Sequence, residues 1–175
     1  MFKRYIPYAH ANSIFDIAPS FFTLHGIKTI FVDLDNTLDS YKSSSPSSRV
    51  FELHDSFLDN GIEMIIISNN KEKRVENYAT QLGVKYLASA HKPFKKRILK
   101  FMNENNIRAE NTVLVGDQLL TDVKLGYNAK IRVILTEKIV KEDQWTTHFN
   151  RMIDRPIRKY LRNHDLLVKW VNVHE

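Results

Sequence analysis

Short apolar runs alternate with longer segments of helical character through the middle of this chain, and that alternation restricts its possible folds more than any other feature. The apolar runs are rich in β-branched residues, which is typical of strands buried on both faces. Strands that alternate with helices predict βαβ units, and therefore an α/β, Rossmann-like fold in which helices cover both faces of a parallel sheet. The expected strands cover residues 27–33, 62–68, 84–88, 112–115 and 131–135, and the expected helices cover residues 48–60, 71–82, 93–105 and 119–127.

The length of 175 residues and a hydrophobic fraction of 43% favour a single domain, 1–175, with a sizeable core at about residues 27–136. Gly61 and Gly83 stand where helix ends are expected, because glycine readily adopts the left-handed conformation found there. The remaining expectations are a serine-rich surface loop at residues 40–48, a basic amphipathic helix at about 149–167 and an N-terminal segment that wraps the core.

The absence of cysteine excludes disulfides, thiolate metal sites and a phosphatase with a cysteine nucleophile. No apolar stretch approaches the roughly 18 residues that a membrane span needs, and the N-terminal residues lack the apolar core of a secretory signal. We therefore expect a cytoplasmic protein. Its net charge of +6 indicates attraction to an anionic partner, although a solvated basic surface without a specific partner explains the charge equally well.

Polar residues at strand ends are the candidates for function, because open α/β sheets bind ligands at the carboxyl ends of their strands. Asp33 and Asp35 follow the first expected strand two positions apart, so their side chains point to the same side of an extended chain. Two neighbouring carboxylates resist joint ionisation unless a cation is bound, and Mg²⁺ prefers oxygen ligands. A polar turn that caps a helix is an equally good interpretation of this pair taken alone.

Three further strand ends carry polar groups. Ser68 and Asn69 follow the second strand, where they can bind phosphate oxygens or cap the next helix. Lys92 precedes a proline after the third strand, where it can neutralise a phosphoryl group or be an ordinary surface lysine. Asp117 and Asp122 follow the fourth strand and can complete a carboxylate metal site.

Together, these strand ends form the ordered pattern D-x-D-x-T, S-N, K-P and G-D-x-x-x-x-D. This pattern, over residues 27–135, resembles the haloacid dehalogenase-like (HAD) phosphatase superfamily. Residues 33–38 and 116–122 look like the bacterial HAD subfamily IIIA proteins related to the phosphatidylglycerophosphate phosphatases. Residues 150–156 are similar to the N-R-x-x-E-R element of these proteins, with Asp154 in place of the glutamate. Lys124 and Lys130 depart from the pattern, which has smaller or apolar residues there.

The resemblance implies a mechanism. Asp33 would be the nucleophile that forms an aspartyl-phosphate, and Asp35 would be the general acid and then the general base. Mg²⁺ would lie between the Asp33 carboxylate, the Asp35 backbone carbonyl and Asp117, with Asp122 fixing this arrangement. The phosphate-binding residues implied by the resemblance are Thr37, Ser68, Asn69 and Lys92.

The spacing of the motifs leaves no room for the cap domain that many HAD enzymes carry. About thirty residues separate Thr37 from Ser68, and some twenty separate Asn70 from Lys92, and the core elements already use both intervals. We therefore expect an open site, which suits a phosphate displayed on a macromolecule or a membrane lipid. The C-terminal helix would lie on an anionic membrane or pack on the sheet with a solvated basic face, and its basic residues are Arg151, Arg155, Arg158, Lys159 and Arg162.

The leading hypothesis is a Mg²⁺-dependent phosphatase that acts on phosphatidylglycerophosphate or a similar phospholipid headgroup, with peripheral membrane contact. A second enzyme hypothesis is a phosphatase without a cap that acts on protein, sugar or nucleic-acid phosphates. A hypothesis of another class is a non-catalytic scaffold that binds RNA or a protein. The sequence has no aromatic-rich basic motif of the RNA-binding type, so a nucleic-acid partner is not expected.

Overall fold

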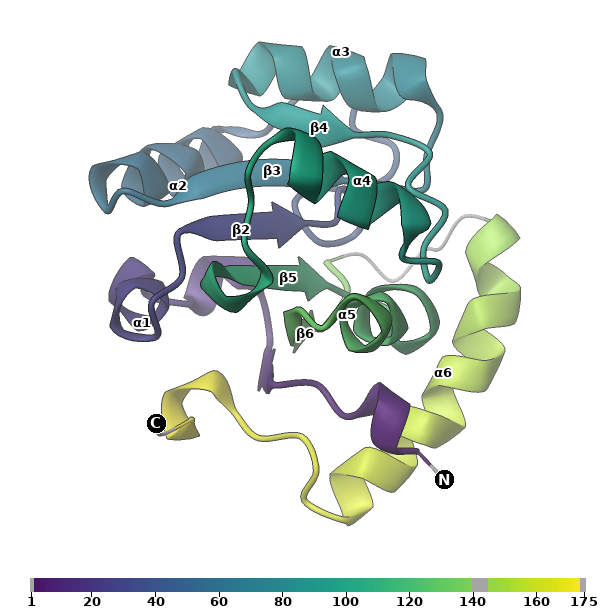
Figure 1. The fold of residues 1–175 in the computed structure, drawn as a ribbon. Coiled ribbons are helices and arrows are strands. Elements are labelled where there is room, and N and C mark those ends of the chain that lie inside the picture. The colour runs from purple at the N-terminus through teal and green to yellow at the C-terminus, as the bar shows by residue number, and fades with distance from the viewer. Residues whose placement is uncertain (1, 140–144, 174–175) are drawn as a thin grey trace.

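The computed structural model describes residues 2–139 and 145–173, with side chains described up to residue 139 and from residue 152. The described residues form a six-stranded sheet in the order β1-β6-β5-β2-β3-β4, and every pair of neighbouring strands is parallel (Figure 1). The strands are β1 (Ala9–Ala11), β2 (Thr29–Val32), β3 (Glu63–Ile67), β4 (Lys85–Leu87), β5 (Thr112–Gly116) and β6 (Arg132–Thr136).

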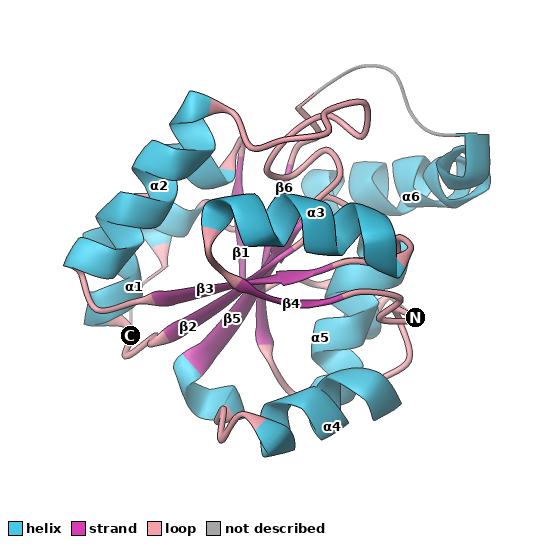
Figure 2. Ribbon diagram, turned by 90° about the horizontal axis from the view of Figure 1, so that it is seen from above, coloured by secondary structure: helices cyan, strands magenta, loops and turns pink. Residues whose placement is uncertain are grey.

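Helices cover both faces of this sheet (Figure 2). The helices are α1 (Pro19–Leu24), α2 (Ser48–Asp59), α3 (Glu72–Leu82), α4 (Lys96–Glu104), α5 (Lys124–Ala129) and α6 (Trp145–Asn163). The short helical turns are η1 (Lys3–Tyr5), η2 (Ile14–Asp16), η3 (Ala109–Asn111), η4 (Leu119–Val123, a π-helix) and η5 (Trp170–Asn172).

Two apolar clusters hold these layers together, one on each face of the sheet. Successive strand side chains point to opposite faces, so Ile30 and Val32 of β2 join one cluster and Phe31 joins the other. The first cluster contains buried residues of α1, α2 and α3, and the second contains buried residues of α4, α5 and α6. The predicted α/β architecture with helices on both faces is therefore confirmed.

The five predicted strands correspond to β2–β6. The two glycines that were predicted at helix ends also lie there. Gly83 ends α3 with φ 75°, and Gly61 follows α2 with φ 68°. The sequence pattern missed β1, a strand of three residues that pairs with β6, and it missed the short α1. The prediction of a helix from residue 93 was wrong at its start, since α4 begins at Lys96 after a turn in which the Phe94 N–H donates to the His91 carbonyl.

β1, near the N-terminus, and the segment that follows α6 lie side by side at the margin of the sheet. Ile157 and Leu161 of α6 are buried in the second cluster, so this helix packs on the body of the protein through its apolar face. After α6 the chain runs beside β1, where the His10 N–H donates to the Val168 carbonyl at 2.7 Å. The backbones of His10 and Lys169 form an isolated parallel β-bridge there. None of the described helices combines the length and the apolar character that crossing a membrane would require.

The serine-rich segment between β2 and α2 is a loop fastened to the body of the protein. The buried carboxylate of Asp39 accepts hydrogen bonds from the Ser47 N–H, the Ser47 hydroxyl and the Tyr78 hydroxyl of α3. Side chains of α3 also donate to the loop carbonyls of Ser43 and Ser44. No cap domain is inserted at this position or elsewhere in the described residues.

Candidate active site

The candidate site lies where the strand order changes direction. The chain passes from β2 to β3 and β4 on one side, and it returns through β5 to β6 on the other. Strands β2 and β5 are therefore neighbours, with Val32 paired to Val115, and the residues that follow them meet at one edge of the sheet. This is the position at which open α/β sheets bind their ligands.

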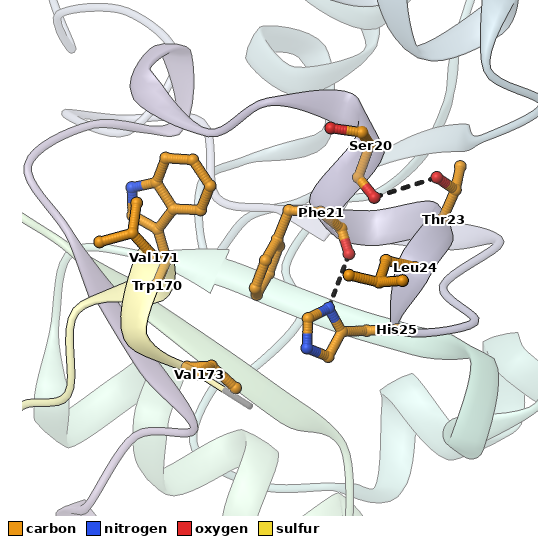
Figure 3. A pocket seen from close by; sticks show the side chains of 8 residues that line it. All are labelled: Ser20, Phe21, Thr23, Leu24, His25, Trp170, Val171 and Val173. Carbon is orange, nitrogen blue, oxygen red and sulfur yellow. Dashed lines mark hydrogen bonds between the residues drawn. The ribbon is translucent and has the colours of Figure 1, made fainter. Parts of the chain in front are cut away.

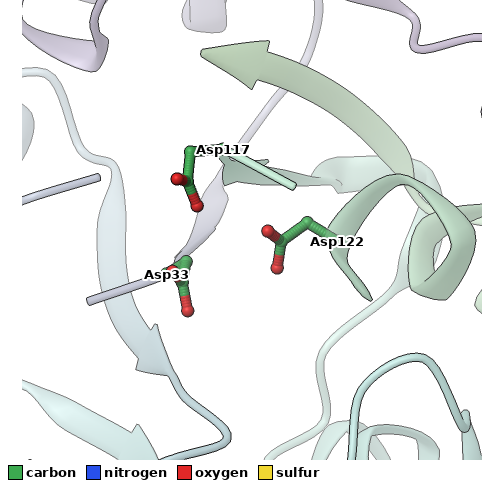
Figure 4. A group of neighbouring side chains, drawn as sticks. All are labelled: Asp33, Asp117 and Asp122. Carbon is green, nitrogen blue, oxygen red and sulfur yellow. The ribbon is translucent and has the colours of Figure 1, made fainter. Parts of the chain in front are cut away.

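Three buried carboxylates converge at this edge (Figure 4). Asp33 follows β2, Asp117 follows β5 and Asp122 lies in η4. One oxygen from each carboxylate lies within 4.8 Å of the others, and the three residues are 6%, 0% and 0% exposed, respectively. Two oxygens that bind one Mg²⁺ on opposite sides are about 4.2 Å apart, so this all-oxygen group fits a hard divalent cation after small side-chain adjustments.

The loop from residue 116 to residue 122 closes tightly around the Asp122 carboxylate. The Gln118 N–H donates to Asp122 Oδ2 at 3.1 Å, and the Asp122 N–H donates back to the Gln118 carbonyl at 2.9 Å. Gly116 leaves the space that the carboxylate needs, because a Cβ at this position would lie 2.4 Å from Asp122 Cγ. The sequence G-D-x-x-x-x-D therefore places its second aspartate by a close backbone approach.

A buried lysine joins two of the three carboxylates. Lys92 Nζ lies 2.5 Å from Asp33 Oδ1 and 2.7 Å from Asp122 Oδ1, and it also donates to the Ile67 carbonyl at the end of β3 at 3.1 Å. Burial by itself lowers the pKa of Lys92, but the adjacent carboxylates of Asp122 and Asp33 outweigh burial and raise it. Lys92 is therefore a cation at neutral pH.

The surroundings of Asp33 work against its ionisation. Burial raises its pKa well above the usual range, and the neighbouring carboxylates of Asp122, Asp117 and Asp35 add to this effect, while Lys92 opposes it. Asp33 and Asp122 share the ammonium group of Lys92. Buried charge of this kind is costly unless it is paired, so a divalent cation matches the charge of the site as well as its ligand chemistry.

Asp35 lies at the rim of the site, apart from the three clustered carboxylates. Arg74 of α3 forms an ion pair with it, with Nη2 2.5 Å from Asp35 Oδ1, and the Asn70 side-chain amide donates to Asp35 Oδ2 at 3.0 Å. Arg74 also donates to the Ser43 carbonyl, which connects Asp35 to the serine-rich loop. The sequence reasoning missed Arg74, because an arginine in the first turn of a helix carries no recognisable motif.

The structure gives Ser68 and Asn69 local partners that the sequence did not specify. The Ser68 hydroxyl is buried and accepts from the Asn70 N–H at 3.0 Å. The Asn69 amide pairs with the backbone of Lys92 in both directions, at 2.6 and 3.0 Å, and so holds the loop that carries the buried lysine. Thr37 is buried, and its hydroxyl has no hydrogen-bond partner among the residues that the structure describes.

The C-terminal helix also reaches the site, which the sequence reasoning did not foresee. The Asp154 carboxylate accepts hydrogen bonds from the Leu119 and Leu120 N–H groups at 2.9 and 3.3 Å. Arg158 donates to the Asp117 carbonyl. The prediction that Arg158 belongs to the solvent-facing basic surface was wrong, since its side chain is only 12% exposed. The Arg151 side chain, which the same prediction included, lies outside the described residues.

A surface hollow elsewhere on the molecule lacks this chemistry. It has a volume of about 730 Å³ and lies between α1 and the C-terminal segment (Figure 3). Phe21 and Trp170 meet edge to face across it, with ring centroids 5.5 Å apart. Its lining residues are apolar or uncharged polar ones, apart from His25, whose Nδ1 is hydrogen-bonded to the Phe21 carbonyl. The carboxylates therefore define the candidate active site.

Comparison with known proteins gives consistent results. The family model described as haloacid dehalogenase-like hydrolase matches residues 12–136. The "Probable phosphatase YqeG" of Bacillus subtilis (strain 168) is 32% identical over 160 residues, which cover 91% of this chain and 93% of that protein.

Among solved structures, an uncharacterized protein from Listeria monocytogenes serotype 4b has a TM-score of 0.53 at 14% identity, covering 78% of this chain and 99% of that one. A candidate 3-deoxy-D-manno-octulosonate 8-phosphate phosphatase from Vibrio cholerae has a TM-score of 0.52 at 17% identity, covering 89% of this chain and 93% of that one. At these identities, the likeness to both structures concerns the fold alone.

Proposed function

This chain belongs to the haloacid dehalogenase-like hydrolase family, and on that premise we propose that it is a Mg²⁺-dependent phosphatase whose nucleophile is Asp33. The observation that carries the proposal is the convergence of Asp33, Asp117 and Asp122 with the buried Lys92 at the switch point of the sheet. The name of the Bacillus subtilis relative, a probable phosphatase, supports the same reaction class.

Asp33 attacks phosphorus with a carboxylate oxygen. The new oxygen–phosphorus bond forms as the bond from phosphorus to the leaving oxygen breaks, and this step yields an aspartyl-phosphate. Lys92, which stays protonated beside Asp33, supplies positive charge close to the incoming phosphoryl oxygens. Asp33, Asp117 and Asp122 would hold Mg²⁺, which when bound reduces the repulsion between carboxylate and phosphate.

Asp35 carries the proton in both halves of the reaction. It donates a proton to the leaving oxygen in the first half, and it takes a proton from water in the second half as water attacks the phosphorus atom. The bond from Asp33 to phosphorus then breaks, inorganic phosphate leaves and the Asp33 carboxylate is restored. Arg74 and Asn70 orient the ionised Asp35 carboxylate through the contacts at its two oxygens. One of these contacts must open when Asp35 carries the proton that it donates.

Asp33→Asn tests the nucleophile with p-nitrophenyl phosphate and Mg²⁺. Asparagine is nearly the same size but is not a competent nucleophile, so we expect kcat to fall by more than about a thousandfold, or roughly 4 kcal/mol. Asp59→Asn, at the exposed end of α2, is the control with the same change of charge and should keep wild-type activity. A smaller loss in Asp33→Asn would argue against covalent catalysis at Asp33.

Asp35→Asn supplies an independent test. p-Nitrophenolate leaves without much help from an acid, whereas hydrolysis of the aspartyl-phosphate needs a base. We therefore expect this variant to accumulate a covalent phosphoenzyme that is visible as a mass increase of the intact protein. Absence of phosphate release and of phosphoenzyme in the wild-type protein would favour the scaffold hypothesis.

For the substrate, we propose a phosphomonoester on a phospholipid headgroup of the phosphatidylglycerophosphate type. The lack of a cap domain in the described residues and the exposed cations Arg155, Lys159 and Arg162 on α6 support a large anionic substrate. Initial rates on phosphatidylglycerophosphate in mixed micelles, compared with rates on phosphoserine peptides and sugar phosphates, test this choice. Higher kcat/KM on the soluble phosphates would favour the alternative phosphatase without a lipid substrate.

A further inference from the structure

We infer that Asp154 and Arg158 of α6 are positioning residues for the metal-binding loop, so that the C-terminal helix is part of the active site. The inference deepens the proposed function and rests on Asp117 and Asp122 being metal ligands. The family model ends at residue 136 and does not include this helix. Through Asp154 and Arg158, the helix contacts the backbone of Asp117, Leu119 and Leu120.

Asp154 holds the inner part of the loop. Its carboxylate is buried, and it accepts from two successive N–H groups, those of Leu119 and Leu120, at the start of η4. These N–H groups have no partner within their own helix, because the first turn of a helix leaves its donors free. A buried carboxylate that accepts two backbone hydrogen bonds forms strong charge-assisted contacts, which fix the start of η4 and therefore the approach to Asp122.

Arg158 holds the outer part of the same loop. It lies one helical turn after Asp154, and its guanidinium donates to the carbonyls of Asp117 and Thr136. Glu137 fixes that guanidinium in turn, with Oε2 3.3 Å from Arg158 Nη1. The backbone of Asp117 is thereby tied to a side chain whose own direction is set by an ion pair.

The spacing of these residues shows why one helix can perform both tasks. Asp154, Ile157, Arg158 and Leu161 recur at intervals of three and four residues, so they share one face of α6. Ile157 and Leu161 anchor that face in the apolar cluster, while Asp154 and Arg158 meet the loop. Displacement of this face of α6 would move the backbone of residues 117–120. The carboxylates of Asp117 and Asp122 would then no longer converge on one point.

Direct binding of Mn²⁺ to the metal-free protein tests the inference without relying on catalysis. Outer contacts that orient metal ligands typically contribute 10- to 100-fold in metal affinity. We therefore expect Asp154→Asn and Arg158→Gln each to weaken Mn²⁺ binding, followed by electron paramagnetic resonance, by about tenfold or more. Asp154→Glu keeps a carboxylate on the same face and should bind Mn²⁺ more tightly than Asp154→Asn does.

Matched controls separate positioning from folding. Lys159→Gln removes a neighbouring exposed cation of α6, and Asp59→Asn removes an exposed carboxylate, and both should bind Mn²⁺ as the wild-type protein does. Thermal unfolding of each metal-free variant shows which variants are folded, and if Asp154→Asn does not fold, Arg158→Gln and Asp154→Glu carry the test.

Wild-type Mn²⁺ affinity in folded Asp154→Asn and Arg158→Gln would overturn the inference. Equal weakening in Asp154→Glu and Asp154→Asn would also overturn it, because the carboxylate would then not be the cause. Neither result affects the phosphoenzyme test, so a failure of the inference is distinguishable from a failure of the proposed function. A wild-type protein that binds no Mn²⁺ would remove the metal site and the inference together.

Discussion

At the scale of single residues, the candidate site depends on how little space surrounds the Asp122 carboxylate. Gly116 lies directly against it, and the Gln118 N–H, the Thr121 hydroxyl and Lys92 Nζ all contact its oxygens. These contacts on several sides leave the Asp122 carboxylate little room to move. The geometry of the carboxylate cluster therefore depends on Gly116, a residue that contributes no side chain.

The first prediction is that Gly116→Ala damages metal use. The new Cβ would lie 2.4 Å from Asp122 Cγ and 2.6 Å from Asp122 Oδ2, so the carboxylate must leave its present position beside Lys92. We expect the Mg²⁺ concentration for half-maximal activity to rise at least about tenfold, and the free energy of unfolding to fall by about 1–3 kcal/mol through overpacking. Mg²⁺ titrations and urea unfolding measure the two effects. An unchanged Mg²⁺ requirement would show that the carboxylate relaxes at no cost.

Most residues of the candidate site were predicted from their positions at the carboxyl ends of strands, and the others were missed for a physical reason. Asp33, Lys92, Asp117 and Asp122 follow strands, so a pattern in sequence order predicts that they meet in space. Arg74 and Arg158 reach the site from helices, and only the packing of those helices brings them there. The polar side chain of Asn69 was predicted to bind phosphate, and its pairing with the Lys92 backbone cannot be read from its position after a strand.

At the scale of elements, the serine-rich loop shows how a segment without regular structure can be held in one place. Asp39 is buried under the loop, and Tyr78 donates to it from α3 at 2.6 Å. Burial, together with the hydrogen bond to Asp39, raises the pKa of Tyr78, so its hydroxyl remains a donor at neutral pH. The loop is thereby attached to the same helix that supplies Arg74 to the rim of the site.

The second prediction concerns this attachment. Tyr78→Phe removes one of the three hydrogen bonds to the Asp39 carboxylate and leaves the two from Ser47. Because the acceptor is buried and charged, we expect the free energy of unfolding to fall by about 1.5–3 kcal/mol, measured by urea unfolding. Tyr127→Phe alters a tyrosine that is 56% exposed and should have little effect. Equal stability in both variants would mean that Ser47 alone satisfies Asp39.

The elements that the sequence patterns missed are those that form through contacts with segments distant in the sequence. β1 has three residues, too few for a period to be visible, and it forms because β6 offers an unpaired margin. Residues 119–127 were expected to be one regular helix. The structure begins that segment with the π-helix η4, whose first N–H groups donate to Asp154. Contacts of this kind between distant segments leave no trace in the local sequence.

At the scale of the whole molecule, one carboxylate connects β1 to the C-terminal helix α6. Glu137, directly after β6, is hydrogen-bonded to His10 Nε2 of β1 at 3.0 Å and lies within 3.3 Å of Arg158 and Arg162 of α6. The hydrogen bond to His10 and the charges of the two arginines lower the pKa of Glu137 to about 2, against the opposing effect of burial.

The third prediction is a dependence of stability on pH that arises from this carboxylate. A lowered pKa in the folded protein means that the contribution of Glu137 is fully present above its ordinary value of 4.5 and is lost as the pH falls toward about 2. Glu137→Gln cannot titrate, so its free energy of unfolding should fall less steeply than that of the wild-type protein across this range. Urea unfolding at a series of pH values compares the slopes, and parallel curves would contradict the assignment.

The pairing of the C-terminal segment with β1 affects how accessible the edge of the sheet is to another molecule. The outer strand of any sheet presents unused N–H and C=O groups, to which a strand of another molecule can add. At the β4 margin the outer strand has only three residues and carries the charged Lys85, both of which discourage such addition. At the β1 margin the chain occupies the position with its own residues 168 and 169. The C-terminal segment thus leaves fewer backbone groups of β1 open to intermolecular strand addition, a consequence that concerns aggregation and not catalysis.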